Sequence, residues 1–166
     1  MLKHHLQVPA IIALFLLIFI GQGCGPSQEE LTIGALKHFH RGNQLFSKND
    51  PRQAIHEYKM AITLDKQQSV FHYNLGLAYY RLVLYEQAIE AYRDAITHQP
   101  ELGEAWYNLS LALDKIGETD KAFLAYERYQ KLNQAQIQAQ PKADQPKPVI
   151  VQKPKTPVTQ KKTVTL

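Results

Sequence analysis

Histidines are the first residues to consider, because imidazole nitrogens bind metals and move protons near neutral pH. The sequence has seven of them. His4 and His5 lie in an apolar N-terminal segment, which a soluble site would not include. His40 and His56 fall on different predicted helices, with no carboxylate or cysteine at the spacing of a metal-ligand set. We therefore expect no metal centre and no cofactor.

Catalytic motifs are missing as well. The sequence contains no phosphate-binding loop, paired-cysteine motif, haem-attachment motif or nucleophile elbow. His38, His72 and Trp106 follow one another at equal intervals along the chain. An aromatic ring at one recurring position predicts a packing role for these two histidines. The sequence therefore favours a binding protein, not an enzyme.

The single cysteine, Cys24, follows a candidate export signal. Residues 1–23 begin with a basic stretch, continue through an apolar run at 8–20 and end in small residues. The junction resembles the cleavage site of bacterial lipoproteins, where a small residue, here Gly23, precedes a cysteine that is acylated on sulfur. Gly21 departs from that pattern, which usually has leucine there. We expect membrane attachment through acylated Cys24 or, alternatively, through a retained N-terminal span.

Positive charge is concentrated at the C-terminal end. The formal net charge is +4, yet residues 135–166 alone hold six lysines against Asp144. The rest of the chain is therefore close to neutral, and it lacks the basic stripe expected of a nucleic-acid-binding domain. Prolines recur through the same segment, which predicts the end of the last helix and then a disordered Pro, Gln and Lys-rich tail within 137–166.

The middle of the chain repeats with a period of about 34 residues, a length typical of helical repeat units. Its three copies span 35–68, 69–102 and 103–136. The pattern resembles the tetratricopeptide repeat, in which an aromatic residue, Leu-Gly, a large residue, Ala, an aromatic residue, Ala and Pro follow in order. The second copy carries this pattern as His72, Leu75, Gly76, Tyr79, Ala88, Tyr92, Ala95 and Pro100.

This repeat predicts an all-α fold of three stacked helix-turn-helix hairpins, which the resemblance makes a right-handed α-solenoid. Small residues at 42, 76 and 110 would let the two helices of each hairpin approach closely. We expect helices at 35–48, 51–65, 69–82, 85–98, 103–116 and 119–138, after a linker at 24–34. The apolar turn Val83-Leu84 indicates either a contact surface or packing against Tyr85.

The resemblance also implies a binding surface. In tetratricopeptide arrays the first helix of each hairpin lines a concave groove that holds an extended peptide or a partner helix. On the matching positions, the groove would present Phe39, Asn43, Phe46, Tyr73, Asn74, Leu77, Tyr80, Arg81, Tyr107, Asn108 and Leu111. One subfamily grips a terminal carboxylate through cations in such a groove. Phe39, Glu104 and Asn108 take those places here, so we do not expect that mode.

The sequence thus predicts a protein-protein interaction scaffold of the bacterial cell envelope. It would be anchored in the membrane, most simply the outer membrane facing the periplasm. The alternative is a cell-wall accessory protein, whose basic tail contacts anionic envelope polymers while the repeats recruit an enzyme. Sedimentation with cell walls that is sensitive to salt would separate the alternative from the first function.

Overall fold

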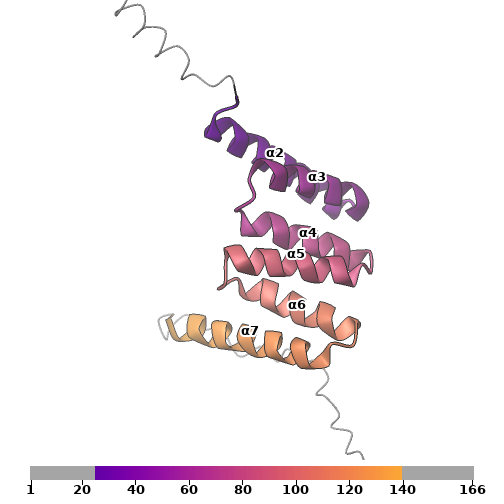
Figure 1. Cartoon of the computed structure of the whole chain (residues 1–166), viewed down its shortest axis with the longest axis vertical. Helices are drawn as coiled ribbons and strands as arrows, with labels where there is room; N and C mark the ends of the chain where they lie inside the picture. Colours follow the sequence, from indigo (N-terminus) through magenta and orange to yellow (C-terminus); the bar gives the residue numbers. More distant parts are fainter. Residues whose placement is uncertain (1–24, 140–166) are drawn as a thin grey trace, which may run out of the picture.

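The computed structural model describes residues 25–139 as a stack of helices (Figure 1). The predicted export signal, Cys24 and the predicted tail after residue 139 lie outside the described residues. In chain order the helices are α2 (Gln28–Ser47), α3 (Pro51–Leu64), α4 (Ser69–Arg81), α5 (Tyr85–His98), α6 (Gly103–Lys115) and α7 (Thr119–Ala139). Residues 25–139 contain no strand.

The helices pair in the order of the chain. Helix α2 packs on α3, α4 on α5 and α6 on α7, while the α3–α4 and α5–α6 contacts join one hairpin to the next. Figure 1 shows the three hairpins following one another along the long axis of the molecule. Because each hairpin contacts only its neighbours in sequence, the described residues form a solenoid. The predicted all-α stack of hairpins is confirmed.

The first helix begins earlier than the sequence analysis predicted. Most of the expected 24–34 linker is helical, because α2 begins at Gln28. Its start is a reciprocal cap: the Glu30 amide donates to Ser27 Oγ at 3.2 Å, and the Ser27 amide donates to the Glu30 carboxylate at 2.8 Å. Such a capping box satisfies two amides that would otherwise lack partners. The repeat period hid this start, because the helix extends beyond the repeat.

Small residues bring the helices of a hairpin together, as predicted, and tyrosine rings fill the contact. A Cβ atom on Gly42 would lie 2.6 Å from the Tyr58 ring, and one on Gly76 would lie 2.5 Å from the Tyr92 ring. Both tyrosines are fully buried. A larger residue at either glycine would push a ring out of the core, so the recurrence of glycine at this position of the repeat reflects a steric requirement.

The turn inside each hairpin has one residue in the left-handed region. Asn49 has φ 63°, Val83 has φ 64° and Gly117 has φ 80°, and the three occupy the same position of successive repeats. Asparagine and glycine accept this conformation readily, whereas a β-branched valine is strained in it. Val83 is also 64% exposed, so most of its side chain faces solvent.

The C-terminal end of the stack is closed by α7 itself. Tyr129, which stands where the earlier copies have alanine, lies 5.2 Å from Tyr107 and 5.9 Å from Tyr126, measured between ring centroids. No hairpin follows α7 among the described residues. The larger side chain covers the end of the stack that a further repeat would otherwise cover.

Candidate functional site

The predicted groove residues all lie on the first helices of the hairpins. Helix α4 contacts both α2 and α6 directly, so these three helices form one surface, here called the first-helix face. Helix α2 contributes Phe39, Asn43 and Phe46; α4 contributes Tyr73, Asn74, Leu77, Tyr80 and Arg81; α6 contributes Tyr107, Asn108 and Leu111. Ten of the eleven are half-buried and Arg81 is exposed.

Tyr73 joins α4 to α6 at the centre of this face. Its hydroxyl accepts a hydrogen bond from Asn108 Nδ2 at 3.1 Å, and its ring lies 6.1 Å from that of Tyr92. Burial raises the pKa of Tyr73, and the nearby Glu104 carboxylate raises it further. The Asn108 amide also donates to the Glu104 carbonyl at 2.8 Å. The oxygen of the Asn108 side chain is left to accept from a ligand backbone.

Tyr80 and Tyr107 extend the aromatic surface beside Tyr73. The ring of Tyr80 meets that of Tyr85 edge-on at 5.3 Å. Burial is the main cause that raises the pKa of Tyr80. The nearby Tyr85, Tyr107 and Asp114 side chains raise it further. The Glu104 and Asp114 carboxylates place negative charge near these tyrosines, which favours a neutral or basic segment over an acidic one.

Two predicted groove residues already serve the fold. The Phe39 ring lies 4.9 Å from that of Phe71, where it packs α2 against α4. Asn43 Oδ1 accepts a hydrogen bond from the Tyr58 hydroxyl at 2.8 Å. The structure thus engages both in contacts of the core, and the part of the face left for a ligand is centred on α4 and α6.

Arg81 and Asn74 are also placed by internal contacts. The Arg81 guanidinium lies 4.1 Å from the centre of the Phe46 ring and donates to the Phe46 carbonyl at 3.3 Å. This stacking joins α4 to the end of α2. Asn74 Nδ2 donates to the Val70 carbonyl of its own helix at 2.8 Å, which leaves the side-chain oxygen for another donor.

A buried carboxylate was missed by the sequence analysis. Glu57 is 8% exposed and contacts His38 Nδ1 at 2.7 Å and Arg41 Nε at 3.3 Å. The histidine at 38, predicted as a packing ring, is therefore also a polar partner. The sequence does indicate this carboxylate, because copies two and three of the repeat have alanine where the first copy has Glu57. A charge in place of a small core residue requires partners.

The second repeat histidine has a different environment. His72 is buried and its Nε2 lies 2.9 Å from the Lys66 carbonyl, while its Nδ1 lies 3.7 Å from the Asp94 carboxylate. Within residues 25–139, no group of three or more His, Cys, Asp or Glu side chains is arranged to hold a metal ion.

Two repeat models of known families match the helical region. A TPR repeat model matches residues 42–83, and a tetratricopeptide repeat model matches residues 73–139. No curated protein matches the chain. The helical hairpins define an α-solenoid of the interaction-repeat class. More specifically, this helical region belongs to the tetratricopeptide repeat family.

Solved structures share this fold. The second TPR domain of Spaghetti (RPAP3), bound to the HSP90 peptide SRMEEVD, is 24% identical with a TM-score of 0.62; the match covers 63% of this chain and 96% of that one. MamA is also 24% identical with a TM-score of 0.62, over 67% of this chain and 69% of that one. The TPR2B domain of yeast Sti1, in complex with an Hsp70 peptide, is 19% identical with a TM-score of 0.61, over 62% and 82%.

Proposed function

We propose that this protein is a non-catalytic interaction scaffold of the bacterial cell envelope, which binds a segment of a partner protein on its first-helix face. One observation carries the proposal: Tyr73, Tyr80 and Tyr107 gather on α4 and α6 beside the amide oxygens of Asn74 and Asn108. Tyrosine contributes large, rigid contact area at low entropic cost, and amide oxygens accept from a peptide backbone. Related TPR domains hold HSP90 or Hsp70 peptides, which supports a peptide ligand here too.

The charges near the first-helix face limit which kind of peptide segment can bind there. Glu104 and Asp114 lie close enough to the tyrosines to raise their pKa values. Arg81 is the one cation among the predicted groove residues, and it is stacked on Phe46. An acidic terminal peptide such as SRMEEVD would meet negative charge without a matching cluster of cations. We infer an apolar or basic segment as the ligand.

Site-specific crosslinking tests the proposal. A photoreactive amino acid at Asn74 or Leu111 should crosslink to one and the same partner in native membranes, whereas the same group at the exposed Arg52 on α3 should not. Mass spectrometry then identifies the partner. Crosslinks from Arg52 alone, or from the tail alone, would show that the first-helix face is not the binding surface.

Affinity measurements with that partner give the second test. Truncating a central aromatic anchor typically costs about 2 kcal/mol, roughly a thirtyfold loss of affinity. We expect that loss for Tyr80→Ala and a smaller one for Asn74→Ala, which removes no contact between helices. Arg52→Ala is the matched control, and circular dichroism checks the fold. Equal affinities for Tyr80→Ala and Arg52→Ala would contradict the proposal.

Membrane attachment is the second half of the proposal. No helix among residues 25–139 is long and apolar enough to cross a membrane. The sequence around Cys24 supports attachment through acyl chains, each of whose buried methylenes contributes about 0.8 kcal/mol. Cys24→Ala should release the protein from membranes or leave it uncleaved. Unchanged mass and fractionation of that variant would favour a retained N-terminal span.

A further inference from the structure

A second groove lies away from the first-helix face, between α5, α6 and α7. It encloses about 610 Å³, within the range of about 300–1,000 Å³ found for ligand pockets. Its apolar lining comprises Ile96, Trp106, Leu109, Leu113, Leu124 and Ala125. Leu124 is 63% exposed, so this part of the apolar lining faces solvent. We name this site the α5–α7 groove.

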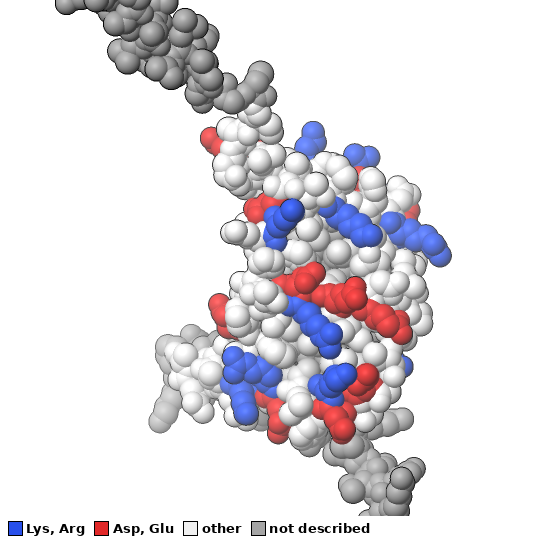
Figure 2. Space-filling model, viewed as in Figure 1, with Lys and Arg blue, Asp and Glu red and all other residues white. Residues whose placement is uncertain are grey.

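Every charged residue that lines the α5–α7 groove is a cation. They are Arg93 on α5 and Lys121 and Arg128 on α7. Arg93 and Arg128 are exposed and form no ion pair with another residue in the range 25–139, whereas Lys121 Nζ lies 3.0 Å from Glu118. Figure 2 shows positive charge on α7 below the acidic band of α5.

The neutral polar groups of the lining are used internally. The Trp106 indole donates to the Pro100 carbonyl at 2.8 Å, and the Thr97 hydroxyl donates to the Arg93 carbonyl at 2.9 Å. A ligand would therefore find an apolar floor and cations on both walls. Ion pairing and apolar contact are the interactions that such a surface offers.

The contact between the first and second hairpins, here called the first junction, can be compared with the contact between the second and third hairpins. This second junction holds the α5–α7 groove. A shift by one repeat places Glu90 at the position of Leu124 and Asp94 at the position of Arg128. The first junction thus carries two carboxylates where the second carries an apolar side chain and a cation. Both junctions stack hairpins in the same way, so the packing of repeats does not require the cationic, apolar character of the second.

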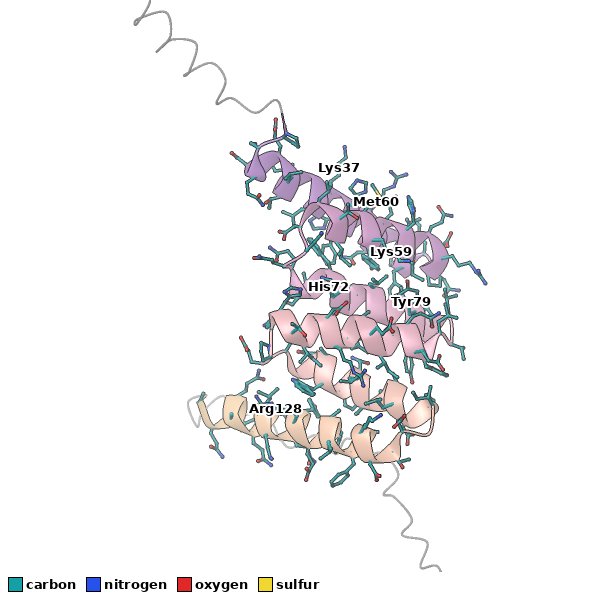
Figure 3. All side chains as sticks on the ribbon, viewed as in Figure 1. Lys37, Lys59, Met60, His72, Tyr79 and Arg128 are labelled. Atoms are coloured by element: carbon teal, nitrogen blue, oxygen red, sulfur yellow. The ribbon has the colours of Figure 1, made fainter. Side chains whose placement is uncertain are left out.

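Two charged residues at the first junction have a close neighbour. Asp94 lies 3.7 Å from His72, and Lys59 lies 5.7 Å from the centre of the Tyr79 ring. Figure 3 labels Lys59, Tyr79 and His72 at that junction and Arg128 on α7. At the second junction Leu113 replaces Tyr79, so Arg93, the equivalent of Lys59, has no tyrosine ring beneath it. At the second junction Arg93 and Arg128 are therefore available to a ligand.

We propose that the α5–α7 groove binds an acidic amphipathic segment of a protein, distinct from the ligand of the first-helix face. An apolar side chain of the segment would enter the groove over Trp106, and flanking carboxylates would pair with Arg93 and Arg128. Cations on both walls suit a segment that has acids on either side of its apolar stripe. The chain's own C-terminal segment is excluded by charge, since residues 135–166 hold six lysines against one aspartate.

Trp106 makes the proposal directly measurable, because it is the sole tryptophan of the chain and lies in the groove. The full chain, in a neutral detergent, is titrated with an amphipathic peptide that carries leucines at helical spacing flanked by glutamates. A matched peptide has lysines in place of the glutamates. We expect Trp106 emission to change with the acidic peptide and not with the basic one, and binding to weaken as ionic strength rises.

Two variants take their residues from the preceding repeat. Arg128→Asp introduces the residue found at 94, and Leu124→Glu introduces the residue found at 90. Both positions are exposed, so the fold should persist, as circular dichroism would confirm. Reversing one exposed charge should weaken binding of the acidic peptide roughly tenfold. Arg52→Asp, a charge reversal outside the groove, is the matched control and should leave binding unchanged.

Several results would overturn the proposal. Equal emission changes with both peptides, no change with either, or unaltered binding by Arg128→Asp would each refute an acidic ligand. An emission change with anionic phospholipid vesicles but not with the acidic peptide would assign the groove to lipid. Self-association in sedimentation that Arg128→Asp abolishes, without peptide binding, would assign it to a second copy. Tyr80→Ala should leave this binding intact, which separates it from the first-helix face.

Discussion

Two equivalent tyrosines offer a stringent test of how the two helices of a hairpin pack. Tyr58 and Tyr92 are both 0% exposed, and each ring lies against a glycine of the facing helix. The Tyr58 hydroxyl donates to Asn43 Oδ1 at 2.8 Å, whereas the Tyr92 hydroxyl has no hydrogen-bond partner among residues 25–139. We predict that Tyr58→Phe destabilises the protein and that Tyr92→Phe does not.

One substitution between the repeats explains the difference. Leu77 occupies the position that Asn43 has in the first repeat, and its side chain cannot accept a hydrogen bond. Loss of the Tyr58 hydrogen bond should cost about 1 kcal/mol of unfolding free energy. Removing the unpartnered Tyr92 hydroxyl removes a desolvation penalty of about 1–3 kcal/mol, so that variant should be neutral or more stable. The two unfolding free energies should differ by about 2 kcal/mol.

Urea denaturation of the full-length variants, followed by circular dichroism, measures this difference at constant m-value. A change of about 1 kcal/mol corresponds to about 4 °C in melting temperature for a domain of this size. The control is Asn43→Leu, which reproduces the arrangement of the second repeat: in that background Tyr58→Phe should be neutral or stabilising, as predicted for Tyr92→Phe. If Tyr92→Phe destabilised the protein as much as Tyr58→Phe, the Tyr92 hydroxyl would have a partner and the reasoning would fail.

Further predictions concern backbone, packing and pH. Gly76→Ala should cost roughly 1–3 kcal/mol in a urea titration, because its Cβ would lie 2.5 Å from the Tyr92 ring, while Gly103→Ala, with its nearest contact at 3.6 Å, should be close to neutral. Val83→Gly should raise stability by about 1 kcal/mol by relieving the left-handed strain at φ 64°; a lower melting temperature would contradict this. Burial raises the pKa of Tyr58 from 10.0 to about 12, so the contribution of this group to stability should be constant below pH 10 and fall as the pH rises toward 12. Alkaline titration by circular dichroism measures that fall, which Tyr58→Phe should make shallower.

The hairpins and their order could be predicted from the sequence. Small residues at 42, 76 and 110 recur at the same spacing because each must admit a neighbouring helix, a local requirement within one hairpin. Helix ends near Pro51 and Gly117 follow from equally local backbone chemistry. The start of α2 was local as well, since Ser27 and Glu30 form its capping box, but the repeat period drew attention away from it.

The tertiary structure decided which of the predicted groove residues remain available to bind a ligand. Phe39 and Asn43 match the family pattern for a groove, yet contacts with Phe71 and Tyr58 already engage them. Those partners belong to other helices, so their distances depend on how the helices pack and not on spacing along the chain. A pattern that repeats in sequence therefore determines the scaffold, because each hairpin meets the same steric demand.

The functional consequence of the differences between repeats is visible only in the tertiary structure. Leu124 and Arg128 are ordinary residues for a helix surface when viewed in the sequence alone. Stacking of α5, α6 and α7 places them around one apolar groove with Arg93 and Trp106. The sequence by itself determined an interaction solenoid, since its period follows from local packing. The location of surfaces that can bind was decided by the tertiary structure, because each combines side chains from separate helices.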